Sequence, residues 1–410
     1  MYTLVMIKIG AMLMKNFIEF FRRKKDEDVD EEYESKLREH KIKKIKKYGI
    51  LLAIILVVII AIYIFISNKT YTEYSVVQNV ATGDTTKSRY YEYGEYFLRY
   101  SDDGLTYYNG TDVIWDHGFE MKQPIIDICK DYVAIAELGT NDIYIFDTTG
   151  LQGKVKTSYP IIGLEVANQG VVAVITEDKE TNRIEVFDKG GNLIAEGKTV
   201  LSGDGCPVDL SLSEDGSKLM VSYLYVSEGV PQTRVVFYNY SEVGKNEVDR
   251  IVGGFNQYKS TIVPKVEFVT NDIAIAFGDN MFTIYSIKQK PSILLEETFE
   301  QEIKSIIYSD EYVGFVFEPE VLDEPYTIKI YEVDGSLLYE GKLELSYKNI
   351  KLDGDTIVAY SEEDIFITTV DGKIKYSGKC DMVINEVIGL DASYKYVLVT
   401  TESIDEIKLK

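Results

Sequence analysis

Side chains that serve catalysis and cross-linking are scarce in this chain. It holds 3 cysteines, 2 histidines and 1 tryptophan among 410 residues. Cys129, Cys206 and Cys380 lie far apart, which excludes the dense disulfide framework of small secreted domains. A chain of this length can bury a core without such bridges. One cysteine pair could still be bridged, but the odd number leaves at least one thiol free.

Histidine chemistry is limited by number as well. His40 precedes the long apolar run, so His117 is the only histidine in the large C-terminal region. No Gly-x-Ser-x-Gly elbow accompanies it, and the few His and Cys residues lack the spacing of zinc ligands. We interpret His117, in "IWDHGFE", as a structural or exposed residue. The sequence therefore predicts neither a catalytic triad nor a metal centre, and we do not expect an enzyme.

One stretch resembles a phosphate-binding loop and fails on spacing. In "GGNLIAEGKT", five residues separate Gly191 from Gly197, whereas the motif needs four. The pattern recurs in "GSLLYEGK" from Gly335 and in "GKIKYSGK" from Gly372. Three copies at equivalent positions indicate a repeated turn, strand and turn.

A single long apolar run is present near the N-terminus. From Tyr48 to Ile66, 19 residues carry no charge, and as a helix they would span about 28 Å, close to the bilayer core. Five lysines precede the run: Lys41, Lys43, Lys44, Lys46 and Lys47. Basic residues beside a span stay in the cytoplasm, and no Ala-x-Ala-like cleavage site follows. We predict a cytoplasmic tail at 1–47, an uncleaved transmembrane helix at 48–66 and an extracellular domain at 70–410, in a single-pass protein of the cell membrane. Translation starts at Met1 or at Met14.

Charge separates the two sides of the run. Residues 1–47 hold 13 Lys or Arg and 9 Asp or Glu. The whole chain has 44 basic and 67 acidic residues, so 31 basic and 58 acidic residues remain after residue 47, a net charge of −27. Such a domain should repel nucleic acid and would attract basic proteins or peptides. Acidity that only keeps an exposed domain soluble is the simpler alternative.

The region after residue 67 consists of short strands that repeat. Runs such as "YVAIAE", "DIYIFD" and "RIEVFD" are rich in Val, Ile, Tyr and Phe, and they end at turn residues. Seven runs align at Tyr108, Phe146, Phe187, Tyr238, Tyr285, Tyr331 and Thr368, with spacings of 38, 41, 51, 47, 46 and 37. A period near 43 made of four strands is typical of a β-propeller. The fold class predicted is all-β, a WD40- or quinoprotein-like ring.

The number of blades follows from the strands left over. Seven repeats run from about Tyr90 to Cys380, and "INEVIGLD", "YKYVLVTT" and "IDEIKLK" remain at the C-terminus. With "TEYSVVQNVA" from the N-terminal side they make an eighth blade that joins the two ends of the ring and removes free sheet edges. We predict eight blades, with seven as the alternative.

A family resemblance rests on particular stretches. They are "GCPVDLSLSEDGSKLMVSYLYVSEGVPQTRVVFYNYSEVG" with its Ser-x-Asp-Gly turn, "RYSDDGLTYYNG", "SYPIIGLEVANQG" and the single apolar anchor. Together the chain resembles the DUF5711 family of membrane-anchored, propeller-like bacterial proteins, mostly over residues 70–330. The resemblance implies fold and location, and no activity or site residue. Quinoprotein rings hold their quinone with repeated tryptophan motifs, so Trp115 alone argues against that cofactor, and we expect none.

Acidic residues gather in two loops of the predicted ring. One loop, "EPEVLDEP", would join the second and third strands of the sixth blade, and "EDKE" is its counterpart in the third; the candidates are Glu318, Glu320, Asp323, Glu324, Glu177 and Asp178. They could bind calcium, a basic partner or a glycan, or remain solvated. We expect a non-enzymatic platform for a protein or ligand at the bacterial surface, with a glycan-binding or glycan-acting protein that uses acidic residues near the channel as the alternative.

Overall fold

The structure, a computed structural model, describes residues 40, 44, 47–58, 69–81, 88–94, 96–101, 103–110, 112–319, 321, 324–390 and 392–410. The chain divides into two units, Met1–Lys69 and Thr70–Lys410. In the first unit, residues 47–58 are helical. The rest of the predicted span at 48–66 lies outside the described residues, and within the described part no helix is both long and apolar enough to cross a membrane.

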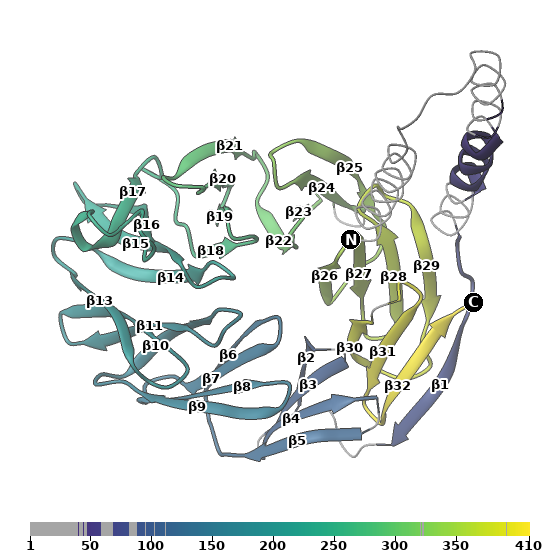
Figure 1. Ribbon diagram of the computed structural model, residues 1–410, viewed down its shortest axis with the longest axis horizontal. Coiled ribbons are helices and arrows are strands. Elements are labelled where there is room, and N and C mark those ends of the chain that lie inside the picture. Colours follow the sequence, from purple (N-terminus) through teal and green to yellow (C-terminus); the bar gives the residue numbers. More distant parts are fainter. Residues whose placement is uncertain are drawn as a thin grey trace, which may run out of the picture. The chain divides into compact units, whose positions relative to one another are not determined.

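The second unit is a ring of eight four-stranded antiparallel sheets, the blades of a β-propeller (Figure 1). In seven blades the strands pair in chain order, from the inner strand to the outer one. The eighth has the order β30-β31-β32-β1, in which β1 (Tyr74–Ala81) comes from the N-terminal side of the ring. The predicted propeller, its eight blades and its closing strand are confirmed.

The strands of the first four blades are β2 (Arg89–Tyr93), β3 (Tyr96–Ser101), β4 (Gly104–Asn109) and β5 (Asp112–Gly118); β6 (Pro124–Cys129), β7 (Tyr132–Glu137), β8 (Asp142–Asp147) and β9 (Gly150–Lys156); β10 (Ile161–Val166), β11 (Val172–Asp178), β12 (Thr181–Phe187) and β13 (Leu193–Val200); and β14 (Cys206–Leu212), β15 (Lys218–Ser227), β16 (Val230–Asn239) and β17 (Ile251–Phe255). A short 3-10 helix, η1 (Val248–Arg250), precedes β17.

The remaining blades contain β18 (Lys265–Phe268), β19 (Ile273–Phe277), β20 (Met281–Ser286) and β21 (Ser292–Thr298); β22 (Ile303–Tyr308), β23 (Tyr312–Phe317), β24 (Tyr326–Glu332) and β25 (Leu337–Leu343); β26 (Asn349–Asp353), β27 (Thr356–Tyr360), β28 (Asp364–Thr369) and β29 (Ile374–Lys379); and β30 (Ile384–Gly389), β31 (Lys395–Thr400) and β32 (Ser403–Leu409) with β1.

The path of the chain distinguishes two faces of the ring. Because neighbouring strands are antiparallel, the first-to-second turns of all eight blades and the third-to-fourth turns of the first seven lie on one face of the ring. Tyr74, where β1 begins, pairs with Leu409 at the end of the third strand β32, so the chain reaches the ring on this same face. We call it the proximal face. The opposite, distal face carries the second-to-third turns and the connections between blades.

The core lies between neighbouring blades. One cluster joins Met220 and Phe237 of the fourth blade to Val266, Ala276 and Tyr285 of the fifth. Second strands such as β27 are buried along their whole length because a blade covers each of their faces. The continuous apolar runs seen in the sequence are therefore second strands, and the alternating runs are outer strands.

Every outer strand begins with a β-bulge. The register between third and fourth strands shifts at the same place in all eight blades. The seven positions aligned in the sequence, from Tyr108 to Thr368, are the third-strand residues at this bulge. A bulge twists an exposed edge and hinders pairing with another sheet.

Beyond the bulge, residues of an outer strand pack against the turn between the third and fourth strands of the next blade. Trp115 stacks on Phe146 with ring centroids 5.1 Å apart, and its Nε1 donates to the Asp147 carbonyl at 3.1 Å. Tyr339 packs on Gly372 in the same way, and a Cβ there would overlap the tyrosine ring. At Gly153 the sizes are reversed, since a Cβ on it would overlap the Lys189 carbonyl oxygen.

Candidate functional site

The acidic loop of the sixth blade joins β23 to β24, as the sequence predicts. Glu320 and Asp323 lie outside the described residues. Glu318 is paired with Lys304 at 2.6 Å, and the Lys304 ammonium lies 4.2 Å from the centre of the Tyr326 ring. The Glu324 backbone N–H donates to the Val321 carbonyl at 3.2 Å. Glu318 is thus partly neutralised by its own blade.

Glu177 and Asp178 are the last two residues of β11 in the third blade. Asp178 pairs with Thr181 directly beside the turn to β12, and Glu177 pairs with Asn182. Glu177 lies near Cys206, whose pKa is raised by burial and then by this carboxylate. Both acidic loops lie on the distal face, because each joins a second strand to a third. No contact in the structure assigns either loop a ligand.

Residues that the sequence singled out as structural behave as such. Among the described residues all three cysteines are free thiols, so the bridge left open above does not form in the structure. His117 packs against Phe119, Tyr144 and Phe146. Gly191, Gly335 and Gly372 adopt positive φ angles in equivalent turns, which confirms the turn interpretation of the phosphate-loop lookalike.

Sequence reasoning named no residue on the wall of the central channel, where four acids gather. Asp127, Glu165, Asp209 and Glu267 lie on β6, β10, β14 and β18, the inner strands of four consecutive blades (Figure 1). We call this set the channel wall. Asp127 and Glu165 are single acids inside otherwise apolar runs, "PIIDIC" and "IIGLEV". That interruption is the signal that could have found them.

Two of these acids have a structural task. Inner strands are sheet edges whose outward N–H groups have no ladder partner. The Val166 N–H donates to Asp127 Oδ2 at 2.6 Å, and the Val266 N–H donates to Asp209 Oδ2 at 2.8 Å. Asp127 and Asp209 therefore each fasten their inner strand to the inner strand of the next blade.

Glu267 belongs to a local ion pair. Its Oε2 lies 3.0 Å from Lys265 Nζ, and it accepts a hydrogen bond from Tyr308 Oη at 3.0 Å. Burial lowers the pKa of Lys265, but Glu267 and Tyr308 outweigh that effect and raise it overall. Lys265 thus remains a cation and partly neutralises the wall.

Glu165 is the acid left over. Its carboxyl group forms no hydrogen bond or ion pair with another described residue. Burial raises its pKa well above the ordinary value, and the charges of Asp127 and Glu267 add to this. Burial likewise raises the pKa of Asp127 to about 7, against the hydrogen bond from Val166. Lys265 is the one lysine among the described residues of these four strands, so burial outweighs charge neutralisation at Asp127 and Glu165 and favours their protonated forms.

Bulges in inner strands place further side chains at the distal mouth of the channel. Register shifts leave Ile162 of β10 and Val208 of β14 without ladder partners. Their side chains are 37% and 39% exposed, although most large apolar residues of neighbouring strands are buried. Bulges commonly re-aim a side chain in this manner. The inner strands that carry the channel wall therefore also carry two exposed aliphatic side chains.

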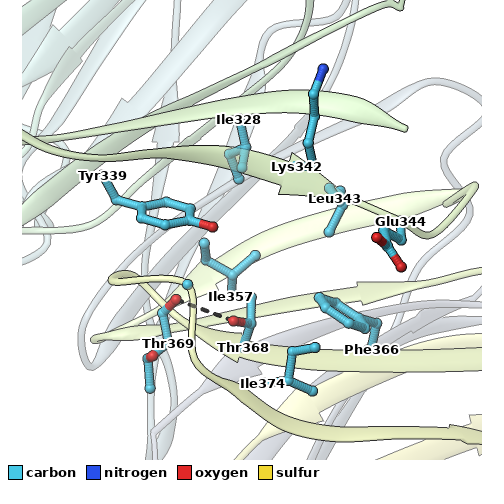
Figure 2. Close-up of a pocket in the computed structure, with 11 residues that line it drawn as sticks. Ile328, Tyr339, Lys342, Leu343, Glu344, Ile357, Phe366, Thr368, Thr369 and Ile374 are labelled. Atoms are coloured by element: carbon cyan, nitrogen blue, oxygen red, sulfur yellow. Dashed lines mark hydrogen bonds between the residues drawn. The ribbon is translucent and has the colours of Figure 1, made fainter. Parts of the chain in front are cut away.

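A separate cavity of about 170 Å³ lies between the sixth and seventh blades (Figure 2). Ile328, Leu343, Ile357, Phe366 and Ile374 line it, with Tyr339 on one side. Glu344 is the one carboxyl group among its described lining residues, so the cavity lacks the pair that glycoside hydrolysis needs. Within the described residues no three His, Cys, Asp or Glu side chains converge as metal ligands do.

Solved structures share the fold at low identity. BamB from Moraxella catarrhalis matches with a TM-score of 0.51 and 12% identity over 82% of this chain and 100% of that one. Sqt1 from Saccharomyces cerevisiae matches with a TM-score of 0.51 and 11% identity over 84% and 99%. Chaetomium thermophilum Sqt1, solved bound to the N-terminus of the ribosomal protein L10, gives 0.50 and 9% over 84% and 97%. At these identities the likeness concerns the fold alone.

Comparison with curated proteins finds no match. A family model, described as a family of unknown function, matches residues 67–409. That range covers the whole ring, including the closing strand β1 and the last strand β32. The chain therefore belongs to the family of unknown function DUF5711.

Proposed function

We propose that this protein is a non-enzymatic, membrane-anchored platform of the cell surface, whose ring binds a cationic segment of a protein partner that enters its channel through the distal mouth. The observation that carries the proposal is the channel wall. Glu165 lies there without a partner among the described residues, beside carboxyl groups that share one lysine.

A bound lysine or arginine would complete this wall. A cation close to Glu165 favours the ionised carboxylate and lowers its pKa again. Binding would therefore release protons and tighten as the pH rises. Ile162 and Val208, toward the distal ends of β10 and β14, add apolar contact, so the matching segment carries an aliphatic residue on the distal side of its basic residue.

The anchor is supported by sequence and by exposure. The side chains of residues 47–58 are all exposed, and Ile50, Leu51 and Val57 are 62%, 52% and 64% exposed. Exposed apolar side chains on a helix suit a lipid environment. The five lysines before it orient the ring to the outside.

Fold analogy agrees with a binding role and adds nothing about the ligand. One of the similar rings was solved with the N-terminus of another protein bound to it. That example shows only that a ring of this type can hold a terminal peptide segment.

Cross-linking in intact cells tests the proposal. Cells producing the full chain are treated with a membrane-impermeant reagent, and the protein is captured for mass spectrometry. We expect modified lysines only after residue 69 and one recurrent partner. Modification confined to Lys41–Lys47 would reverse the topology. A modified ring without any partner would favour the glycan-directed alternative, which then needs two wall carboxyl groups about 5–10 Å apart.

A further inference from the structure

The point where the chain joins the ring is fixed by backbone hydrogen bonds. The Tyr71 N–H donates to the Lys375 carbonyl at 2.8 Å, and the Thr72 N–H donates to the Lys410 carbonyl at 3.0 Å. The Lys410 N–H donates back to the Glu73 carbonyl at 2.7 Å. The chain therefore arrives at the outer rim of the proximal face, at the seventh and eighth blades (Figure 1).

The surface at this point combines lysines with exposed aliphatic side chains of the kind that also begin other outer strands. Val76, Val77 and Ile374 are 50%, 58% and 50% exposed at the starts of β1 and β29. Lys373 and Lys375 flank Ile374, and the Lys408 ammonium lies 5.1 Å from the centre of the Tyr394 ring. We call Val76, Val77, Lys373, Ile374, Lys375 and Lys408 the proximal sector.

Charge also marks this sector. Residues 371–376 and 408–410 contain four lysines and one aspartate, although the region after residue 47 has 58 acidic and 31 basic residues. Aliphatic, tyrosine and lysine side chains together are the mixture that lies at membrane interfaces. Lysines close to an anionic bilayer are attracted to it.

Chain length brings the sector to the bilayer. The apolar run ends at Ile66, and four peptide steps to Thr70 reach at most about 14 Å. If the run spans a membrane, as proposed above, the proximal sector cannot lie far from the lipid headgroups of that membrane. The argument thus depends on the proposed anchor.

We propose that the proximal sector docks on the phospholipid headgroups of the membrane that holds the anchor. Docking at one rim fixes the tilt of the ring. The distal mouth of the channel, with Ile162 and Val208, then points away from the membrane and is open to a partner, whereas Glu165 lies deeper in the channel, three residues nearer the proximal face than Ile162.

Hydrogen exchange of the full chain in vesicles tests this docking. The chain is reconstituted in phosphatidylcholine vesicles with and without phosphatidylglycerol, and in detergent micelles. We expect amides of 74–80 and 374–379 to exchange about tenfold more slowly in the anionic vesicles than in micelles. Residues 193–200 of β13, four blades away across the ring, should exchange equally in both.

Matched variants give the control. Val77 and Ile194 are both bulge residues of outer strands, 58% and 51% exposed. Val77→Asp should abolish the extra protection, and Ile194→Asp should leave it intact.

Vesicle flotation separates the two proposals. A chain that does not float with vesicles lacks the anchor, and both proposals fail. A chain that floats, yet shows equal exchange of 74–80, 374–379 and 193–200 in vesicles and micelles, keeps its anchor and overturns the docking.

Discussion

At the scale of single residues, similar lone acids on the inner strands have different roles. Some connect neighbouring blades, and one has no structural partner. Asp127 and Asp209 accept N–H groups that no sheet partner reaches, whereas Glu165 has no such task. The difference between them lies in backbone geometry around the channel, since all three are lone acids in apolar strands.

Asp127 gives a prediction about pH. Burial raises its pKa from 3.8 to about 7, so between these values the folded state holds a proton that the unfolded state has lost. The free energy of unfolding should therefore fall as the pH rises from about 4 to about 7, by up to about 1.4 kcal/mol per pH unit for this group. Denaturant titrations at several pH values measure the slope.

Two substitutions at Asp127 separate charge from hydrogen bonding. Asp127→Asn keeps an acceptor for the Val166 N–H and cannot ionise, so its slope should be shallower; Glu165 and Asp209, whose pKa values burial also raises, supply the remainder. Asp127→Ala leaves that N–H without a partner and should be about 1–3 kcal/mol less stable than Asp127→Asn. Equal slopes for wild type and Asp127→Asn would contradict the assignment.

At the scale of elements, outer strands determine how blades meet. The sequence did not predict the bulge at the start of each outer strand. The positions aligned from Tyr108 to Thr368 nevertheless proved to be the third-strand residues that pair at the bulge. Period and pairing were predictable because turn residues and alternation repeat in every blade.

The site was less predictable than the fold. The sequence drew attention to Glu318 and Glu177 because charged loops stand out, whereas Asp127 and Glu165 are separated by 38 residues and meet only when β6 and β10 lie side by side. Their proximity depends on ring closure, which no local pattern contains. The bulges that expose Ile162 and Val208 are likewise a property of paired strands.

The packing between blades predicts that alanine lowers the free energy of unfolding at one glycine and not at another. Gly153→Ala places a Cβ against the Lys189 carbonyl oxygen, and we expect a loss of about 1–3 kcal/mol as the second and third blades separate. Gly197→Ala, also in an outer strand, meets open space and should be neutral or slightly stabilising. Thermal or denaturant unfolding compares the two; a tolerated Gly153→Ala would argue against the size-matched contact.

At the scale of the whole molecule, closure by β1 gives the two faces different surroundings. The N-terminal strand completes the last blade from the proximal face, so the anchor proposed above would connect to the ring at that face. The acidic loops and the channel mouth formed by Ile162 and Val208 are on the other side. The domain's net charge and its single point of attachment thus suit a ring that receives a cationic segment from outside.

Site-specific photo-cross-linking tests this account most directly. A photoreactive amino acid replaces Val208 at the distal mouth or Leu193 at the proximal rim of the third blade, both in the full chain in intact cells; the two side chains are 39% and 50% exposed. We predict that Val208 captures one recurrent protein, that Leu193 does not, and that Glu165→Gln weakens capture at Val208. Capture from Leu193 alone, or capture from Val208 that Glu165→Gln leaves unchanged, would contradict the channel wall as the binding site.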